Sequence, residues 1–317
     1  MYLGIDVGGT NIAIGLVDEN CKIIKKDSVA AGKERPFEEI LKDIAELSLR
    51  IVKEAGFSEE QITKIGVGSP GVPDNEKGEI VYASSFPTFK NAPLANELKK
   101  YFPNSDVFLE NDANAATYGE MVAGAAKGKQ NGVAITIGTG IGGGIIINGK
   151  IYSGFNNAGG EIGHKVIVVD GLPCECGRKG CWEVYASGTA LIRQAKEALK
   201  KYPQSLIGKL VCGDLDKINA KTPFDAADEG DSAAKEVIEK YIKYLATGIV
   251  DIVNVFRPEI VVIGGGVSKQ GENLIAPIRE HVRRESYGHD LAKPEIVAAT
   301  LGNDAGIIGA AMLWKQA

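Results

Sequence analysis

The feature that most constrains this chain is a glycine-rich hairpin pattern that occurs twice. Near the start, the apolar segments YLGIDV and IAIGLVD flank the turn GGTN, which predicts two strands joined tightly. About 130 residues later, VAITIGTGIGGGIIINGKIYSG repeats the arrangement, with Thr136 in the position of Asp6 and Gly138 in that of Gly8. Because repetition of one supersecondary unit indicates repeated architecture, we expect two halves of similar design.

Size and composition agree with two domains. The chain has 317 residues, 44% of them hydrophobic, which is more than a single small domain usually requires. A helix is predicted for residues 37–55, a buried strand for EIVVIGGGV and a terminal helix for NDAGIIGAAMLWKQA. We therefore expect an α/β chain in which residues 1–112 and a C-terminal helix at about 303–317 form a smaller domain, and residues 113–302 form a larger one.

Composition argues against several functional classes. The net charge is −5 and the pI is near 5.5, so the basic excess that attracts nucleic acids or membranes is missing. The N-terminus shows no signal-peptide pattern, and no apolar run approaches the ~20 residues that span a bilayer. Five cysteines, three of them close together, favour a metal site over a secreted disulfide framework. We expect a cytoplasmic protein with no nucleic-acid or membrane partner.

The first glycine turn is a candidate phosphate site. Gly8 and Gly9 would let backbone N–H groups approach a phosphate, and Thr10 and Asn11 would add further donors. Asp6, at the end of the first strand, could hold Mg²⁺ directly or through water. A plain hairpin explains this turn equally well when it is considered alone.

The second turn, residues 138–143, matches the pattern G-x-G-x-x-G of dinucleotide-binding proteins. That pattern requires a helix after the turn, whereas the β-branched segment IIINGKI follows here, so we reject this interpretation. A second phosphate hairpin facing the first explains the repeat better. The third glycine turn, residues 264–266, either admits a ligand near the backbone or packs a strand closely against a helix.

A possible general base occurs in the segment ENDANAA. Asp112 stands where a predicted strand ends and a helix begins, so it is either the N-cap of that helix or a base for phosphoryl transfer. The helix N-terminus would help to keep its carboxylate ionised. Asn111 beside it could orient a polyol.

A metal site is predicted by the spacing H-x9-C-x-C-x4-C in residues 164–181. One imidazole and three thiolates complete a tetrahedral Zn²⁺ site, which leaves no position for an activated water and argues against a zinc hydrolase. Glu161 and Glu183 flank this segment, so a metal that fixes the segment would also fix two carboxylates able to bind sugar hydroxyls. The predicted ligands are His164, Cys174, Cys176 and Cys181.

These motifs together resemble a known family. DVGGTN, SPGV, ENDANAA, GTGIGGGIIINGKIYSG, GGEIGH, CECGRKGCWE and IGGGV occur in the order seen in ROK-family proteins, over nearly the whole chain. That family comprises sugar kinases and sugar-responsive repressors with the two-domain sugar-kinase/Hsp70/actin-like (ribonuclease H-like) fold and its interdomain cleft. Within it, the chain is most similar to bacterial-type glucokinases.

The resemblance implies roles for the candidate residues. Asp112 would be the catalytic base, structural zinc would be bound by the four predicted ligands, and Mg²⁺ would accompany ATP. The hexose would be held by Asn111, Asp112, Glu161, His164 and Glu183. The ATP site would comprise Asp6, Gly8, Gly9, Thr10, Asn11, Gly138, Thr139, Gly140, Gly142 and Gly265.

The expected reaction is ATP-dependent phosphorylation of a hexose at its 6-hydroxyl, with glucose as the first choice. The segment ASSFPTFKNAPL, residues 83–94, departs from the family pattern near the sugar loop, where an Asn-Leu pair and a Trp are usual. The acceptor could therefore instead be fructose, mannose or an N-acetyl amino sugar. The donor could also be polyphosphate or ADP, since either could use the same glycine turns. A non-catalytic sugar sensor is the other alternative, and the resemblance implies a homodimer or homotetramer.

Overall fold

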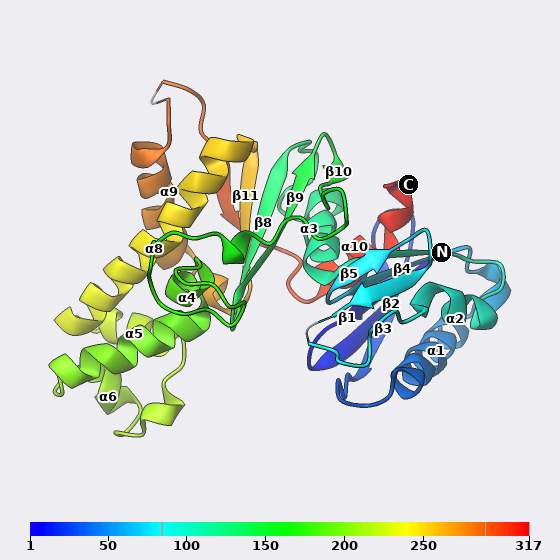
Figure 1. Cartoon of the computed structure of the whole chain (residues 1–317), viewed down its shortest axis with the longest axis horizontal. Helices are drawn as coiled ribbons and strands as arrows, with labels where there is room; N and C mark the ends of the chain where they lie inside the picture. Colours follow the sequence, from blue (N-terminus) through cyan, green and yellow to red (C-terminus); the bar gives the residue numbers. More distant parts are fainter. Residues whose placement is uncertain (84, 289, 317) are drawn as a thin grey trace. The chain divides into compact units, whose positions relative to one another are not determined.

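The computed structural model describes residues 1–83, 85–288 and 290–316. The chain forms two compact units, each assembled from separate segments (Figure 1). Unit 1 consists of Met1–Gly132, Gly144–Gly160 and Thr300–Ala317, and unit 2 consists of Val133–Gly143 and Glu161–Ala299. The C-terminal segment thus returns to the N-terminal unit, but the first crossing between units follows Gly132 rather than residue 112.

The position of helix α3 (Asp112–Val122) explains this difference from the expected boundary. The helix packs against α10 (Asp304–Ala311) in unit 1 rather than opening the second unit. The approach is close, because a methyl group on Gly309 would overlap the carbonyl oxygen of Ala115, and one on Gly119 would overlap that of Ala305. Sequence patterns show where a helix begins but not which unit it packs against.

Unit 1 contains a five-stranded mixed sheet in the order β3-β2-β1-β4-β7. Strands β1, β2 and β3 form antiparallel pairs, while β4 and β7 run parallel to β1. A small second sheet pairs β5 with β6. The strands are β1 (Tyr2–Val7), β2 (Asn11–Val17), β3 (Ile23–Ala30), β4 (Lys64–Ser69), β5 (Val72–Asp74), β6 (Glu79–Tyr82) and β7 (Asp106–Asn111).

The two faces of this sheet carry different helices because side chains alternate along each strand. Leu3 and Ile5 are fully buried in a core that includes the apolar face of α1 (Phe37–Glu54) and residues of α2 (Leu94–Tyr101). Gly4, between them in sequence, faces α10, where a side chain would overlap the carbonyl oxygen of Ile307. The glycines on this face therefore allow α10 to lie directly on the strand backbones.

The second sheet repeats the design of the first and has the order β10-β9-β8-β11-β12. Strands β8 and β9 are joined by three residues, as β1 and β2 are, which confirms the predicted repeat. Its β9–β10 pair is antiparallel and its β11–β12 pair is parallel. The strands are β8 (Gly132–Ile137), β9 (Ile141–Ile147), β10 (Lys150–Ile151), β11 (Ile260–Gly264) and β12 (Glu295–Ala298).

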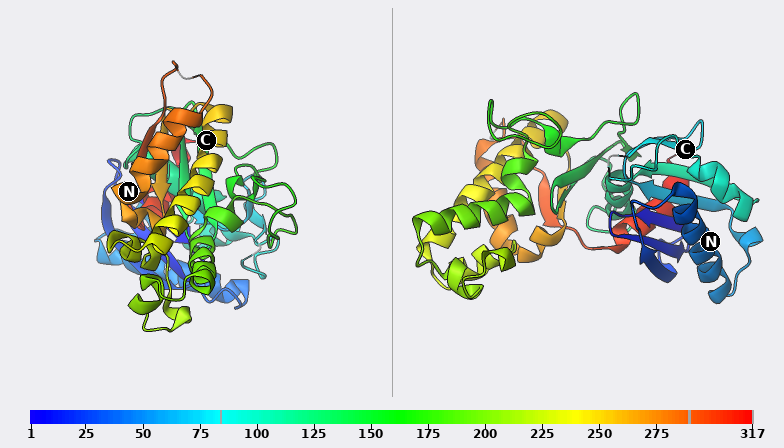
Figure 2. Two further views of the ribbon diagram at one scale, coloured as in Figure 1. Left: turned by 90° about the vertical axis from the view of Figure 1, so that its left-hand side faces the viewer. Right: turned by 60° about the horizontal axis from the view of Figure 1, so that its bottom comes forward.

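The helices of unit 2 follow the metal-site segment in the sequence. The longest, α8, lies alongside α9 (Figure 2). The α/β class predicted from the sequence is confirmed. The helices are α4 (Glu183–Ala186), α5 (Gly188–Lys201), α6 (Leu206–Leu210), α7 (Thr222–Asp228), α8 (Ser232–Phe256) and α9 (Glu272–Glu285).

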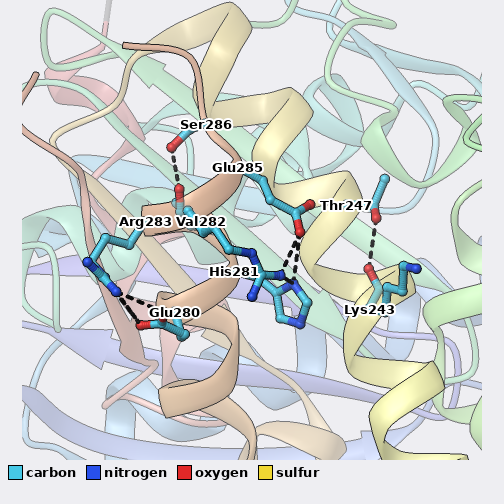
Figure 3. Close-up of polar contacts among 9 residues, drawn as sticks. Lys243, Thr247, Glu280, His281, Val282, Arg283, Glu285 and Ser286 are labelled. Atoms are coloured by element: carbon cyan, nitrogen blue, oxygen red, sulfur yellow. Dashed lines mark hydrogen bonds and ion pairs between the residues drawn. The ribbon is translucent and has the colours of Figure 1, made fainter. Parts of the chain in front are cut away.

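The polar contacts drawn in Figure 3 each lie within α8 or within α9 and its C-cap. Arg283 donates to Glu280 at 2.8 Å, His281 lies 3.4 Å from Glu285, and Thr247 donates to a carbonyl oxygen one turn earlier. Exposed pairs of this kind contribute little to stability. We therefore assign them to the solvated surface of unit 2.

Length and apolarity must coincide for a helix to cross a bilayer. In the part of the chain that the structure describes, none of the helices meets both conditions.

Candidate functional site

A pocket of about 490 Å³ lies beside the end of β1 in unit 1. It is lined by Asp6 and Asn11, both predicted as nucleotide-binding, and also by Lys26 and Asp304, which form an ion pair. Asp6 pairs across the sheet with Ala13, and Ala13 pairs with Ser28. Because Lys26 is two residues from Ser28, it projects from the same face as Asp6.

Lys26 and Asp304 were missed by the sequence analysis. They are 278 residues apart, and only the strand register and the packing of α10 bring them together. The signal that was available is the acidic residue in the first turn of the terminal helix, which by itself is common.

The electrostatic setting of Asp6 is unusual. Burial, together with the negative charge of Asp112, raises the pKa of Asp6 from an ordinary value of 3.8 to about 7. Two carboxylates that disfavour each other's ionisation become a favourable site once a cation is present. A methyl group on Gly306 would overlap the Asp6 carboxylate, so α10 also presses against this group.

The first glycine turn is open on its outer side. Gly8 donates its backbone N–H to Asn11 O at 3.0 Å, and Thr10 O accepts from the backbone of Ala31 at 2.8 Å. Gly9 is exposed, and no other atom lies within 4 Å of the place where its side chain would begin. The turn can therefore present its backbone to a ligand, as predicted.

Asn111, rather than Asp112, is the N-cap of α3. The Asn111 side chain accepts from the backbone N–H groups of Ala113 at 2.9 Å and Asn114 at 3.3 Å. Asp112 is the first helical residue, and its Oδ1 accepts from Ala113 N–H at 3.0 Å. The capping alternative for Asp112 is thus wrong, and its carboxylate lies at the helix end where a negative charge is favoured.

Glu110 organises the same region and was also missed. Its carboxylate accepts from the backbone of Asn111 at 2.8 Å, from the side-chain amide of Asn114 at 3.0 Å and from Ser153 Oγ at 3.3 Å. Burial raises the pKa of Glu110. The sequence shows Glu110 next to the candidate base, but not that Ser153, 43 residues away, comes to meet it.

The second glycine turn lines a pocket of about 370 Å³ in unit 2. Gly265, in the third turn, has φ of 85°, and its Cα approaches the backbone of Ile137 so closely that a side chain would overlap it. The third turn therefore packs closely against strand β8, rather than a strand against a helix, and it also borders the pocket. The lining residues are Thr136, Gly138, Thr139, Gly140, Ile141, Gly142, Glu183 and Gly265.

The predicted metal ligands come together in unit 2. One ligand atom from each of His164, Cys174, Cys176 and Cys181 can be chosen so that all four lie within 4.8 Å of one another. The sulfurs of Cys176 and Cys181 are 3.6 Å apart, and Cys174 Sγ is 3.7 Å from His164 Nδ1. A tetrahedral zinc ion with Zn–S bonds of about 2.3 Å separates two sulfurs by about 3.8 Å, so the arrangement fits zinc.

Glycines shape this cluster. Gly177 and Gly180 have φ of 88° and 80°, values that residues with side chains rarely adopt. A backbone hydrogen bond of 2.8 Å from Cys174 N–H to Arg178 O closes the loop. The N–H of Arg178 also lowers the pKa of Cys176, which favours the thiolate form that binds metal.

The predicted sugar-binding residues are divided between the units. Asn111 and Asp112 belong to unit 1, and the other three belong to unit 2. Glu161 is exposed and precedes a short 3-10 helix, Ile162–His164, in which His164 N–H donates to Glu161 O at 3.1 Å. The Glu183 carboxylate lies 3.3 Å from His164 Nδ1, so these two side chains do lie together.

The divergent segment 83–94 contributes aromatic side chains to the core. Phe86 and Phe89 are fully buried, with ring centroids 4.9 Å apart, and Phe37 of α1 contacts Phe89 edge-on. The first serine of this segment lies outside the described residues. These phenylalanines therefore pack in the core of unit 1 and offer no polar contacts to a ligand.

Comparison with known proteins agrees with this geometry. The family model described as the ROK family matches residues 2–317. The chain belongs to the ROK family. The fold class expected from the motifs is confirmed by the similarity to the solved structure of a ROK protein from Streptomyces griseus.

Some ROK proteins that are similar to this chain over nearly the full length of both are glucokinases. The chain is 41% identical over 314 residues to a glucokinase of Thermotoga maritima, covering 99% of this chain and 97% of that protein. It is 37% identical over 319 residues to a glucokinase of Halalkalibacterium halodurans, covering 99% and 95%. A ROK family glucokinase from Streptomyces griseus, crystallised with glucose and AMPPNP, has a TM-score of 0.81 and 36% identity, covering 100% and 99%.

Replacement of Cys176 by Ser should remove zinc from this ROK protein. The sulfur of Cys176 is one of four ligands, and loss of even a supporting contact costs about 10–100-fold in metal affinity. Metal analysis of purified protein by mass spectrometry should find one zinc per wild-type chain and little in Cys176→Ser. Cys212→Ser, an exposed cysteine outside the cluster, should keep its zinc. Full zinc content in Cys176→Ser would show that the cluster is not the metal site.

Asp6 should make the protein less stable as pH rises. Its pKa is higher in the folded state, so its contribution to stability is fully present below about pH 4 and is lost as pH rises through about 7. In thermal unfolding without added magnesium, the melting temperature of Asp6→Asn should therefore rise relative to that of the wild type between pH 5 and 8. Asp27→Asn, which removes another charge from the same pocket, is the control. A constant difference between wild type and Asp6→Asn across this range would contradict the assignment.

Proposed function

We propose that this protein transfers the terminal phosphoryl group of ATP to the 6-hydroxyl of a hexose, with glucose as the preferred acceptor. The observation that carries the proposal is the 41% identity to a glucokinase over nearly the full length of both chains. The candidate site supports it independently, because a carboxylate at a helix N-terminus and two glycine turns with backbone N–H groups suit phosphoryl transfer to an alcohol.

Asp112 is the proposed general base. The oxygen of the 6-hydroxyl attacks the γ-phosphorus, the bond to the bridging oxygen of ADP breaks, and the hydroxyl proton passes to the Asp112 carboxylate. The N-terminus of α3 favours the ionised form of this group before the reaction. Glu110, by fixing Asn111 and Asn114, holds the first turn of α3 in place.

The phosphates are assigned to the two glycine turns. Backbone N–H groups around Gly8–Asn11 and Gly138–Gly142 would stabilise negative charge on the transferring group, since such donors need no reorganisation during the reaction. We assign Asp6 to the Mg²⁺ of the nucleotide, and the bound ion would neutralise charge on the phosphate oxygens. Lys26, in the same pocket as Asp6, adds a positive charge held by Asp304.

The residues that we assign to the hexose are Asn111, Asp112, Glu161, His164 and Glu183. Zinc, when bound, would have a structural role, because its four ligands all come from the protein. Among the described residues, which include all five cysteines, no disulfide is formed, and free thiols suit a protein of the reducing cytoplasm.

Asp112→Asn should reduce turnover by at least about 10²-fold while leaving hexose affinity nearly unchanged, because an amide keeps the shape but cannot accept the proton. Steady-state kinetics with a coupled ADP assay would measure both effects. Asp106→Asn, at the exposed start of the preceding strand, is the matched control and should keep wild-type turnover. Near-normal turnover in Asp112→Asn would refute the assignment of the base.

The same assay tests the reaction itself. Glucose, fructose, mannose and N-acetylated amino sugars would each be offered with ATP, ADP or polyphosphate. We expect the highest kcat/KM for glucose with ATP. Failure of every hexose to stimulate consumption of any donor would refute the proposed function and favour a sugar sensor.

A further inference from the structure

The carboxylate of Glu183 lies in the second glycine turn, where the proposed function places phosphate. Its Oε2 accepts the backbone N–H of Ile141 at 3.4 Å, and a side chain on Gly140 would begin only 2.6 Å from this oxygen. Glu183 also lines the same 370 Å³ pocket as the turn residues. The turn thus holds an anion supplied by the protein itself, which is the behaviour expected of a phosphate-binding turn.

The other carboxylate oxygen of Glu183 faces the metal-site cluster. Oε1 lies 3.1 Å from Cys174 Sγ and 3.3 Å from His164 Nδ1. Glu183 therefore touches both the turn assigned to nucleotide and the segment assigned to sugar. No other side chain predicted to bind the sugar lines this pocket among the described residues.

Trp182, directly before Glu183, anchors the backbone at this point. Trp182 is fully buried, donates Nε1–H to Tyr244 O at 3.0 Å and fills a notch over Gly248, where a methyl group would overlap its ring. Lys165 Nζ lies 4.6 Å from the centre of the Trp182 ring. The Glu183 side chain is 20% exposed, and rotation about its χ angles moves the carboxylate without disturbing this anchor.

A carboxylate in this position must compete with a phosphate for two reasons. The N–H of Ile141 points at one anion at a time, and two negative groups in one small pocket repel each other. A sugar hydroxyl offers Glu183 another hydrogen-bond donor, since an ionised carboxylate only accepts. Sugar binding therefore favours a position of the carboxylate outside the turn.

We propose that Glu183 couples the two substrates by occupying the phosphate turn until a sugar draws its carboxylate away. This inference rests on the proposed function, because it takes the sugar as the partner of Glu183 and the nucleotide as the ligand of the turn. It gives Glu183 a second role on the donor side. The consequence is that the enzyme binds its phosphate donor weakly while no acceptor is present.

The test measures nucleotide binding without sugar. Glu183→Gln removes the charge, and Glu183→Ala also releases the Ile141 N–H, so both variants should bind magnesium–AMPPNP more tightly than wild type. One hydrogen bond is worth about 0.5–1.5 kcal/mol, which corresponds to roughly 2- to 13-fold in affinity. Isothermal titration calorimetry in glucose-free buffer gives the dissociation constants. Zinc content and circular dichroism confirm that each variant is folded.

Glu161→Gln is the matched control. It removes the other carboxylate assigned to the sugar, but Glu161 does not line the turn pocket, so nucleotide affinity without sugar should equal that of wild type. In wild type and Glu161→Gln, saturating glucose should tighten AMPPNP binding, whereas in Glu183→Ala this gain should be smaller. Unchanged or weaker AMPPNP binding by both Glu183 variants would overturn the inference.

Different results would refute the coupling and the proposed function. If wild type phosphorylates glucose but the Glu183 variants bind AMPPNP no more tightly, only the coupling is refuted. If wild type binds AMPPNP yet phosphorylates no hexose, the proposed function fails. Tighter binding by the variants would then still show that Glu183 obstructs the turn.

Discussion

The packing of α10 on glycines is the constraint on which unit 1 depends. Gly4 lets this helix rest on the backbone of β1, and Gly309 lets it rest on α3. A helix that touches both elements without side chains between them fixes the end of β1 against the start of α3. Asp6 and Asp112 belong to those two ends, so their mutual repulsion follows from backbone packing. Larger residues at these glycines would separate the carboxylates and lower the pKa of Asp6 toward its ordinary value.

Unit 2 fixes its functional side chains by another means. The segment from His164 to Glu183 lies between a short 3-10 helix and α4. Its shape comes from backbone hydrogen bonds within the segment, from the cluster of His and Cys ligands and from Trp182. A tetrahedral metal with four protein ligands does not itself react, but it removes conformational freedom from the chain that carries them. Because Glu183 follows Trp182 directly, the same anchors determine where its carboxylate can reach.

The sequence could predict the features that depend on local chemistry. Both glycine hairpins, the four metal ligands and the helix beginning at Asp112 follow from spacing and residue type, and each is present. The ion pair of Lys26 with Asp304 could not be predicted, because strand register and helix packing are set by the whole fold. The hydrogen bond of Ser153 to Glu110 has the same origin. Asn111 is the N-cap because a cap precedes the first helical residue, which in α3 is Asp112.

The position of Glu183 shows how a residue assigned to one ligand can serve two. Sequence order places it beside the metal ligands, and that order suggests only a sugar contact. The hairpin repeat independently places a phosphate turn in the same unit, and folding brings its Ile141 N–H to the carboxylate. An anion-binding turn in contact with an acidic side chain cannot be neutral toward a phosphate. The order in which such an enzyme fills its sites therefore follows from electrostatics already present in the folded chain.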